Sequence, residues 1–261
     1  MSLPLDHRHA LVCGASEGIG RAAAIALAEL GATVTLLARR TDALVAAVAT
    51  LPAPAGQQHA WIAADMRDTA DLADRIAALA AERPVHILVN NSAGPPGGPA
   101  HSAQVEDFAA VFRQHLLAAQ VAVQAVLPGM RAAQWGRIVN VISTSVKEPI
   151  ANLGVSNTVR GAVASWAKTL ASELGPDGIT VNNVLPGYTR TQRLDQILAE
   201  RAAATGKSAD AIAAGMLATV PAGRFAEPAE IAAAIAFLAS PAAGYVNGIN
   251  LPVDGGRTRS L

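Results

Sequence analysis

The stretch Gly14-Ala15-Ser16-Glu17-Gly18-Ile19-Gly20 decides the fold that we expect for this chain. A short apolar run at residues 10–13 precedes it, and a helical pattern begins at residue 19. Glycines between a strand and a helix let the backbone approach a pyrophosphate, while the helix N-terminus supplies amide hydrogens and a positive dipole end. Glycine alone also collects in ordinary turns, but the order of strand, glycines and helix predicts a dinucleotide-binding site.

Short apolar runs alternate with longer amphipathic stretches along the whole chain. We expect strands at residues 10–13, 33–38, 60–63, 87–89, 137–142, 180–184 and 249–253. We expect helices at residues 19–30, 41–50, 69–83, 105–130, 153–174, 194–204, 209–217 and 228–238. This alternation predicts an α/β fold, a Rossmann-type, doubly wound parallel sheet of seven strands with helices on both faces.

The absence of a Pro-, Gly- or Ser-rich linker predicts a single dinucleotide-binding domain over residues 1–261. The segment at about 192–223 has weak periodicity and follows the sixth expected strand. We interpret it as a substrate lid, although an ordinary surface excursion fits it nearly as well.

Composition narrows the choice of partner and compartment. The chain has 20 basic and 20 acidic residues, so its zero net charge carries no electrostatic sign of nucleic acid or of an anionic membrane. A single cysteine excludes an internal disulfide, and the N-terminal residues lack the pattern of a signal peptide. We also see no apolar run near the roughly 18 residues of a membrane span. We therefore expect a cytoplasmic protein that acts on a small molecule.

The end of the second expected strand bears on which dinucleotide binds. An NAD-specific site carries an acidic residue there for the ribose 2′-hydroxyl, but this chain has Ala38 followed by Arg39 and Arg40. Two guanidinium groups favour a 2′-phosphate, and hence NADP(H) over NAD(H). A solvated strand end is the alternative interpretation of the two arginines, and Glu17 in the glycine loop does not favour a phosphate.

Several motifs in order resemble the short-chain dehydrogenase/reductase family, in particular its 3-oxoacyl-ACP reductases. Residues 13–20 are similar to the family's TGxxxGIG, residues 90–94 (Asn-Asn-Ser-Ala-Gly) to its NNAG turn, and Pro186-Gly187 with a downstream threonine to its PG segment. Residues 230–256 are similar to its closing signature. By this resemblance the cofactor-binding residues are Gly14, Ser16, Glu17, Gly18, Ile19, Gly20, Arg39, Arg40, Asp65, Met66, Asn91, Ser92, Arg160, Pro186, Gly187, Thr189 and Thr191.

The resemblance also implies a homotetramer, formed through the long helices expected at residues 105–130 and 153–174 and through the C-terminal strand region. Small side chains such as Ala162, Ala167 and Ala171 would let helices approach closely across such an interface.

In that family the chemistry rests on Asn, Ser, Tyr and Lys, with the lysine four residues after the tyrosine. Ser143 matches the family serine, but the tyrosine position falls on Ser156, the lysine position on Arg160 and the asparagine position on His115. The lysine normally lowers the phenol's pKa so that it can exchange a proton with the substrate oxygen. Since Tyr188 and Tyr245 are the only tyrosines and neither has Lys or Arg four residues later, no shifted alignment restores the pair.

Three functions stay open for such a site. The first is an NADP(H)-dependent oxidoreductase interconverting a carbonyl and an alcohol, with the proton supplied by His115, Tyr188 or water. The second is a catalytically inactive dinucleotide-binding homologue with a regulatory or structural role. The third is a dehydratase or lyase that uses Arg160 to hold an anionic substrate. For His115 and Tyr188 the plainer interpretations are a helix histidine bonded to backbone and a pocket-lining aromatic residue.

Overall fold

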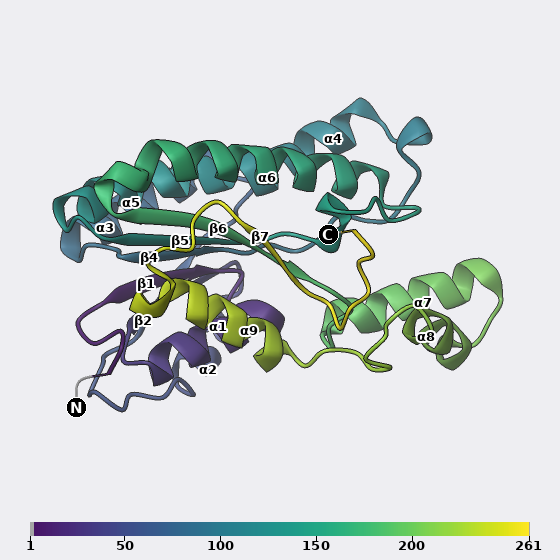
Figure 1. Cartoon of the computed structure of the whole chain (residues 1–261), viewed down its shortest axis with the longest axis horizontal. Helices are drawn as coiled ribbons and strands as arrows, with labels where there is room; N and C mark the ends of the chain where they lie inside the picture. Colours follow the sequence, from purple (N-terminus) through teal and green to yellow (C-terminus); the bar gives the residue numbers. More distant parts are fainter. Residues whose placement is uncertain (1–2, 261) are drawn as a thin grey trace.

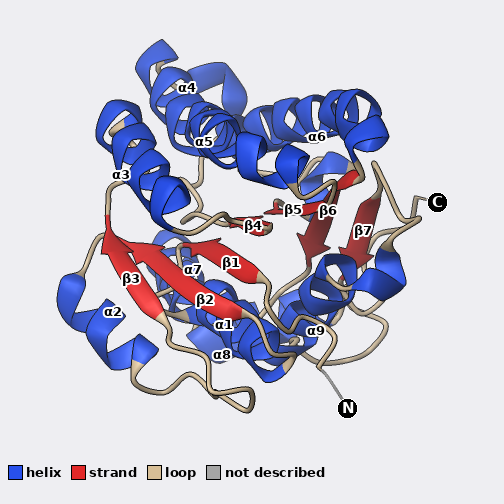
Figure 2. Cartoon of the chain, turned by 90° about the vertical axis from the view of Figure 1, so that its left-hand side faces the viewer, coloured by secondary structure: helices blue, strands red, loops and turns tan. Residues whose placement is uncertain are grey.

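The computed structural model describes residues 3–260, and these form a seven-stranded, all-parallel sheet in the order β3-β2-β1-β4-β5-β6-β7. Helices cover both of its faces, as Figure 2 shows. The strands are β1 (His9–Cys13), β2 (Thr33–Ala38), β3 (Ala60–Ala63), β4 (Ile87–Asn90), β5 (Gly136–Val141), β6 (Ile179–Pro186) and β7 (Asn250–Val253). Because the order reverses between β1 and β4, ligands are expected at the carboxyl ends of these strands. The predicted doubly wound α/β fold is confirmed.

Two helical layers sandwich the sheet (Figure 1). One contains α3 (Thr69–Glu82), α4 (Val105–Phe112), α5 (Ala118–Ala132) and α6 (Gly154–Leu174). The other contains α1 (Gly18–Glu29), α2 (Thr41–Val48) and α9 (Pro228–Ala239). Short 3₁₀ turns occupy Ala100–Ser102, Thr144–Val146, Gly175–Asp177 and Pro241–Ala243. Every expected helix and strand is present, with most ends displaced by one or two residues.

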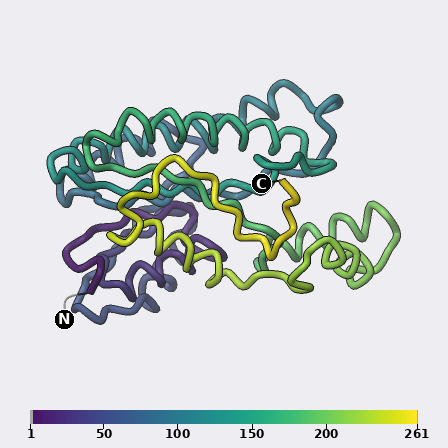
Figure 3. Tube along the Cα trace, in the orientation of Figure 1, coloured from purple at the N-terminus to yellow at the C-terminus, as the bar shows by residue number. Residues whose placement is uncertain are grey.

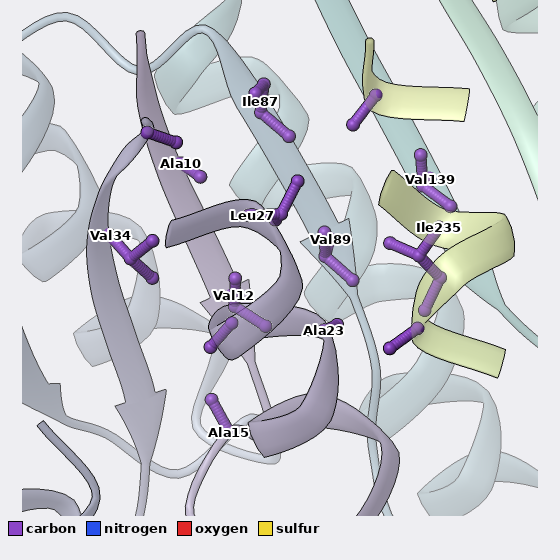
Figure 4. Packing of buried hydrophobic residues seen from close by; sticks show 14 of the residues in the cluster. Ala10, Val12, Ala15, Ala23, Leu27, Val34, Ile87, Val89, Val139 and Ile235 are labelled. Carbon is purple, nitrogen blue, oxygen red and sulfur yellow. The ribbon is translucent and has the colours of Figure 1, made fainter. Parts of the chain in front are cut away.

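The core is aliphatic and divided by the sheet. All five residues of β1 are buried, as are all four of β4, because a parallel sheet covered on both faces has no solvated side. Between the sheet and α1, Val12, Leu27 and Val89 pack against Ile235 of α9 (Figure 4). Small side chains such as Ala23 let α1 approach β1 closely, so the glycine turn between them is held on both sides.

Two expectations about the helices were wrong. The helix expected at 105–130 is interrupted by a π-helical segment, Arg113–Leu117, which adds a residue to one turn and re-aims the side chains that follow. Ala167 and Ala171 do not lie on an intersubunit face, since both are buried against the sheet in the same cluster as Leu88 and Val181. Their small size brings α6 close to β6 instead.

The expectation that no segment could span a membrane has one exception. The stretch Val105–Ala132 is long and apolar enough to cross a membrane by length and composition. In the structure it lies over the sheet between α3 and α6, and Ala122, Val126 and Met130 are buried in the core there. This packing is that of a core helix.

The segment expected as a lid forms two helices, α7 (Gln192–Thr205) and α8 (Ala209–Leu217). They project beyond the sheet, on the side where β6 ends (Figure 3). Leu194 and Met216 pack with Phe225 and Tyr188 in a small apolar cluster of their own. Residues 257–260 return to the same side, where Arg257 and Arg259 donate hydrogen bonds to Thr144 and Glu148 of the loop after β5.

Candidate cofactor and active site

The glycine turn after β1 has the backbone shape that a pyrophosphate site requires. Gly14 and Gly18 have φ of +59° and +57°, a region that disfavours side chains. A Cβ at Gly20 would overlap the carbonyl oxygen of Gly14, so this glycine sets how closely helix and turn can pack. Asn91 fixes the turn from below, because its side-chain amide donates to the carbonyl oxygens of Cys13 and Gly14 at 3.3 and 3.2 Å.

The N-terminus of α1 is free to receive an anion. Its N-cap residue Glu17 makes no capping hydrogen bond, and the first turn carries no acidic residue. The amides near Gly18, Ile19 and Gly20 therefore keep the unspent donors and positive dipole that favour phosphate. The side chain of Glu17 instead pairs with Arg40 at 3.1 Å, on the flank of the turn. The turn and the helix end thus fit a dinucleotide pyrophosphate.

The carboxyl end of β2 presents cationic side chains where the adenosine ribose is expected. Ala38 is nearly buried, and both Arg39 and Arg40 are exposed. Arg40 is paired with Glu17, whereas Arg39 has no ion pair among residues 3–260. Arg39 is therefore the better placed of the two for a 2′-phosphate.

Asp65 is held by a neighbour that the sequence interpretation missed. Arg67 donates to both of its carboxylate oxygens, the shortest at 2.7 Å, and these hydrogen bonds lower the pKa of Asp65. The carboxylate stays ionised and fixed at the end of β3. Met66 beside it is buried and lines the cavity described below.

His115 lies on the π-helical segment and is 6% exposed. Its Nδ1 is 2.6 Å from the hydroxyl of Ser92, while its buried Nε2 has no hydrogen-bond partner. Burial and the nearby charge of Arg160 lower the pKa of His115 to about 2, so the ring is neutral near pH 7. It is bonded to a side chain and not to backbone, unlike the plainer interpretation of the sequence. A neutral ring can accept or donate one hydrogen bond but holds no extra proton to give away.

The residues that we expect at the catalytic serine, tyrosine and lysine positions come from two elements. Ser143 follows β5, and its oxygen accepts a hydrogen bond from the Ser145 amide at 3.1 Å. Ser156 is half-buried in the first turn of α6, and Arg160 lies one turn later on the same helix. Arg160 is 7% exposed, has no ion pair within residues 3–260, and donates to the Val141 carbonyl oxygen at 2.8 Å. Burial lowers its pKa to about 10, so it remains a cation at pH 7.

A chain of asparagine side chains crosses the sheet toward this cation, and the sequence interpretation did not foresee it. The Asn90 amide donates to Asn140, that of Asn140 to Asn183, and that of Asn183 to Asn250, at 2.8 to 2.9 Å. Each donor points the same way, which leaves the Asn90 carbonyl oxygen without a partner at the other end. The signal was available as asparagines at registered positions of four strands, but only strand pairing aligns them.

Several of these groups, but not Ser143 or Ser156, line one small cavity of about 10 Å³. Its lining includes Asn90, Ser92, His115 and Arg160. Two of its polar atoms, the Asn90 oxygen and His115 Nε2, lack partners, and the volume suits one water molecule. The expected site residues Ser92, His115 and Arg160 therefore do converge.

The other expected residues flank the end of β6. Pro186 ends the strand, and the amide of Gly187 donates to the carbonyl oxygen of Val253 at 2.9 Å. The Thr189 hydroxyl donates to the Gly187 carbonyl oxygen at 3.1 Å, and Thr191 is the N-cap residue of α7 without a side-chain capping hydrogen bond. A Cβ at Gly18 would contact the Thr191 methyl group at 3.3 Å, so the glycine turn and the start of α7 face each other.

Tyr188 lies in the same loop, and its ring packs against two other side chains. It meets the ring of Phe225 edge-on, and the guanidinium of Arg257 lies 4.8 Å from its centroid. Phe225 belongs to the apolar cluster under α7 and α8.

A comparison with known families gives the identity of this arrangement. The family model described as "Enoyl-(Acyl carrier protein) reductase" matches residues 14–258, from the glycine turn to the C-terminal residues. This chain belongs to the short-chain dehydrogenase/reductase family. It is an α/β protein whose relatives in this family are oxidoreductases.

Characterised short-chain dehydrogenases/reductases match over almost their whole length. The 3-oxoacyl-[acyl-carrier-protein] reductase FabG of Vibrio cholerae is 34% identical, covering 97% of this chain and 98% of the relative. The cis-4-hydroxycyclohexanecarboxylate dehydrogenase of Sinomonas cyclohexanicum is 36% identical, covering 96% of each chain. The structure of L-sorbose reductase from Gluconobacter frateurii, complexed with NADPH and L-sorbose, superimposes with a TM-score of 0.93, 28% identity and complete coverage of both chains.

Proposed function

We propose that this short-chain dehydrogenase/reductase is an NADP(H)-dependent oxidoreductase that interconverts a carbonyl and an alcohol through an atypical active site. One observation carries the proposal. The buried guanidinium of Arg160 has no counter-ion within residues 3–260 and lies one turn from Ser156 in the cavity shared with Ser92 and His115. An uncompensated buried cation is costly, which favours a site built to meet ribose hydroxyls and a developing negative charge.

Two features support NADP(H) as the dinucleotide. The ribose position carries Ala38 in place of an acid, and Arg39 is free of ion pairs within the described chain. The sorbose reductase named above was solved with NADPH, and this mildly favours the same choice here.

When bound, the nicotinamide supplies or accepts the hydride. Ser143 orients the substrate oxygen. Because the Ser143 oxygen already accepts the Ser145 amide, its hydroxyl proton is free to be donated to that oxygen. Arg160 stabilises the negative charge that develops when a carbonyl is reduced, since a cation buried away from water acts strongly on a nearby charge.

The final proton requires a source other than a phenol at position 156. His115 is neutral, so it can pass a proton along a hydrogen-bonded path with Ser92 but cannot act as a stored acid. Tyr188 could donate only by leaving its packed position against Phe225. An ordered water beside Ser143 and Ser156 is the source we propose. A lost general acid lowers the rate roughly 10²–10⁴-fold, so we expect slow turnover.

A catalytically inactive dinucleotide-binding protein is the second candidate. The packing of the Tyr188 ring against Phe225 and Arg257 favours it, because the other tyrosine of the chain, Tyr245, is fully exposed to solvent.

Titration with NADPH and NADH followed by fluorescence, then incubation of the saturated protein with ketones and aldehydes, tests both candidates. We expect tight NADPH binding and slow oxidation. Binding without turnover would favour the inactive candidate, and absence of binding would contradict both. Among single variants, His115→Ala and Tyr188→Phe separate their roles, because unchanged turnover would remove each as a proton source.

A double variant, Ser156→Tyr with Arg160→Lys, measures how much catalytic rate is lost because Ser156 and Arg160 replace tyrosine and lysine. We expect it to raise kcat/KM for the best carbonyl substrate at least 10²-fold, because it restores a phenol beside an ammonium group. Arg160→Lys alone is the matched control and should not reproduce the gain. A double variant that binds NADPH but gains no rate would show that substrate is not held at Ser143.

We further propose a cytoplasmic homotetramer. Exposed apolar side chains support the assembly, namely Phe112 and Leu117 near the π-helical segment and Phe237 on α9. Phe237 borders an apolar groove of about 820 Å³ between α1 and α9. Light scattering of the purified protein tests the state, and a monomer at micromolar concentration would contradict it.

A further inference from the structure

The C-terminal residues form a strap across the outer end of the active site. The strap, defined here as residues 254–260, follows β7 and reaches back to the loop after β5 (Figure 1). Glu148 in that loop accepts hydrogen bonds from the amides of Arg259 and Ser260 at 2.6 and 2.7 Å. Asp254 accepts the amides of Gly256 and Thr258 at 3.0 and 2.8 Å. Both nearby carboxylates therefore hold the strap backbone in place.

The side chain of Arg257 contacts the two loops that follow β5 and β6. Its Nη1 donates to the hydroxyl of Thr144 at 3.2 Å, and Thr144 directly follows Ser143. Its guanidinium lies over the Tyr188 ring at 4.8 Å. Arg257 thus bridges the ends of β5 and β6, the two strands whose loops carry Ser143 and the Pro186-Gly187 turn.

Arg257 has more donors than the structure uses. A guanidinium carries five N–H donors, and the one hydrogen bond of this side chain within residues 3–260 is that to Thr144. Its Nε is buried and has no partner. No carboxylate of the described chain forms an ion pair with it, because Asp254 and Glu148 serve the backbone amides. A fixed, half-buried guanidinium with unspent donors is preorganised for an external anion.

We propose that Arg257 is a specificity-determining residue that binds a carboxylate of the substrate, so that this protein acts on oxo or hydroxy acids. The inference rests on the proposed function and adds a substrate class to it. The reacting carbonyl would lie at Ser143 and the carboxylate at Arg257, which contacts the next residue of the loop, Thr144. A planar fork suits a carboxylate bidentately, whereas a neutral ketone or alcohol would leave the buried Nε unsatisfied.

A binding measurement that needs no turnover tests the inference. The protein is saturated with NADP⁺, which cannot reduce a ketone, and is titrated by calorimetry with levulinate, 4-oxocyclohexanecarboxylate and the methyl ester of each. We expect at least one acid to bind about 10- to 100-fold more tightly than its ester. Equal affinity of acid and ester, or no binding of any of the four, would overturn the proposal.

Two variants that each remove one positive charge, Arg257→Gln and Arg259→Gln, assign the effect to one side chain. Arg257→Gln should abolish the preference for the acid. Arg257→Lys, which keeps the charge, should keep part of this preference. Arg259→Gln is the control, since this exposed neighbour contributes only its backbone amide to the strap. Equal losses in the Gln variants at 257 and 259 would reduce the effect to general charge and overturn the assignment.

The affinity for NADPH separates substrate from cofactor. It should be unchanged in Arg257→Gln, and a loss of NADPH binding with an intact acid preference would place Arg257 at the cofactor instead. Turnover is measured in a separate assay with NADPH. Carboxylate binding that depends on Arg257 without any turnover would sustain this inference and contradict the proposed oxidoreductase activity. Turnover with equal kcat/KM for acids and esters would sustain the oxidoreductase activity and contradict the role of Arg257.

Discussion

Arg160 is a cation buried beside a neutral histidine, and both properties follow from where α6 and the π-helical segment place them. Its only hydrogen bond within the described chain, to Val141, satisfies one donor and no charge. An unpaired buried charge lowers the stability of the empty site. A ligand that supplies the missing partner removes this penalty and is bound more tightly for that reason. His115 stays unprotonated chiefly because it is buried, and the nearby charge of Arg160 lowers its pKa further.

Replacing this charge should therefore stabilise the protein and weaken its function. Arg160→Met keeps much of the volume and removes the charge, so we expect the free energy of unfolding at pH 7 to rise by roughly 1–3 kcal/mol. The affinity for NADPH should fall at the same time. Urea denaturation and fluorescence titration measure the two effects. Lys168→Met, an exposed change on the same helix, should alter neither. A destabilised Arg160→Met protein would show that the charge is compensated.

At the scale of elements, the asparagine chain couples four strands through their side chains. Asn90, Asn140 and Asn183 are buried, and each link joins strands that already share backbone hydrogen bonds. Buried amides must be paired, and here each amide pairs the next. The chain ends at the Asn90 oxygen beside the polar cavity, so the sheet presents an acceptor to the site.

Removing an asparagine from the middle of this hydrogen-bonded row should lower the free energy of unfolding more than removing the one at the edge. Asn140→Leu leaves the Asn90 amide and the Asn183 oxygen buried without partners, a loss of about 2–5 kcal/mol. Asn250→Leu on the edge strand β7 orphans only the Asn183 amide and should cost about half as much. Urea midpoints at an unchanged m-value give the comparison. Equal losses in the two variants would mean that water replaces the missing partners.

At the scale of the whole molecule, buried histidines set how stability depends on pH. His9 is 2% exposed, its Nε2 is 2.8 Å from the Thr35 hydroxyl, and burial lowers its pKa from 6.5 to about 4. The unfolded chain then binds more protons than the native one between these two values. His115 acts in the same direction.

The contribution of the neutral His9 ring to the free energy of unfolding should therefore be fully present above pH 6.5. It should be lost as the pH falls toward 4. For His9 alone the loss is of the order of 3 kcal/mol. His9→Gln should flatten the plot of unfolding free energy against pH between 6.5 and 4, whatever its effect at neutral pH. His7→Gln, which changes an exposed neighbour, should leave the slope unaltered. An unchanged slope in His9→Gln would contradict a neutral buried ring.

The strands, their order along the chain and the glycine turn are readable without a structure, because they depend on local patterns of sequence. A run such as residues 33–38 is readable from apolar content, and Gly14 from its place between strand and helix. The sequence also predicts that Ser156 and Arg160 occupy the positions where the family has Tyr and Lys.

The interactions between residues far apart in the chain become visible once the fold is known. The Asn90-to-Asn250 chain needs strand register, the contact of His115 with Ser92 needs the π-helical turn, and Arg257 reaches Thr144 across 113 positions. The burial that makes Arg160 an unpaired cation is also invisible in the sequence. Hydrophobic periodicity is a property of neighbours in the chain, whereas desolvation and hydrogen bonding depend on which distant groups the fold brings within a few ångströms.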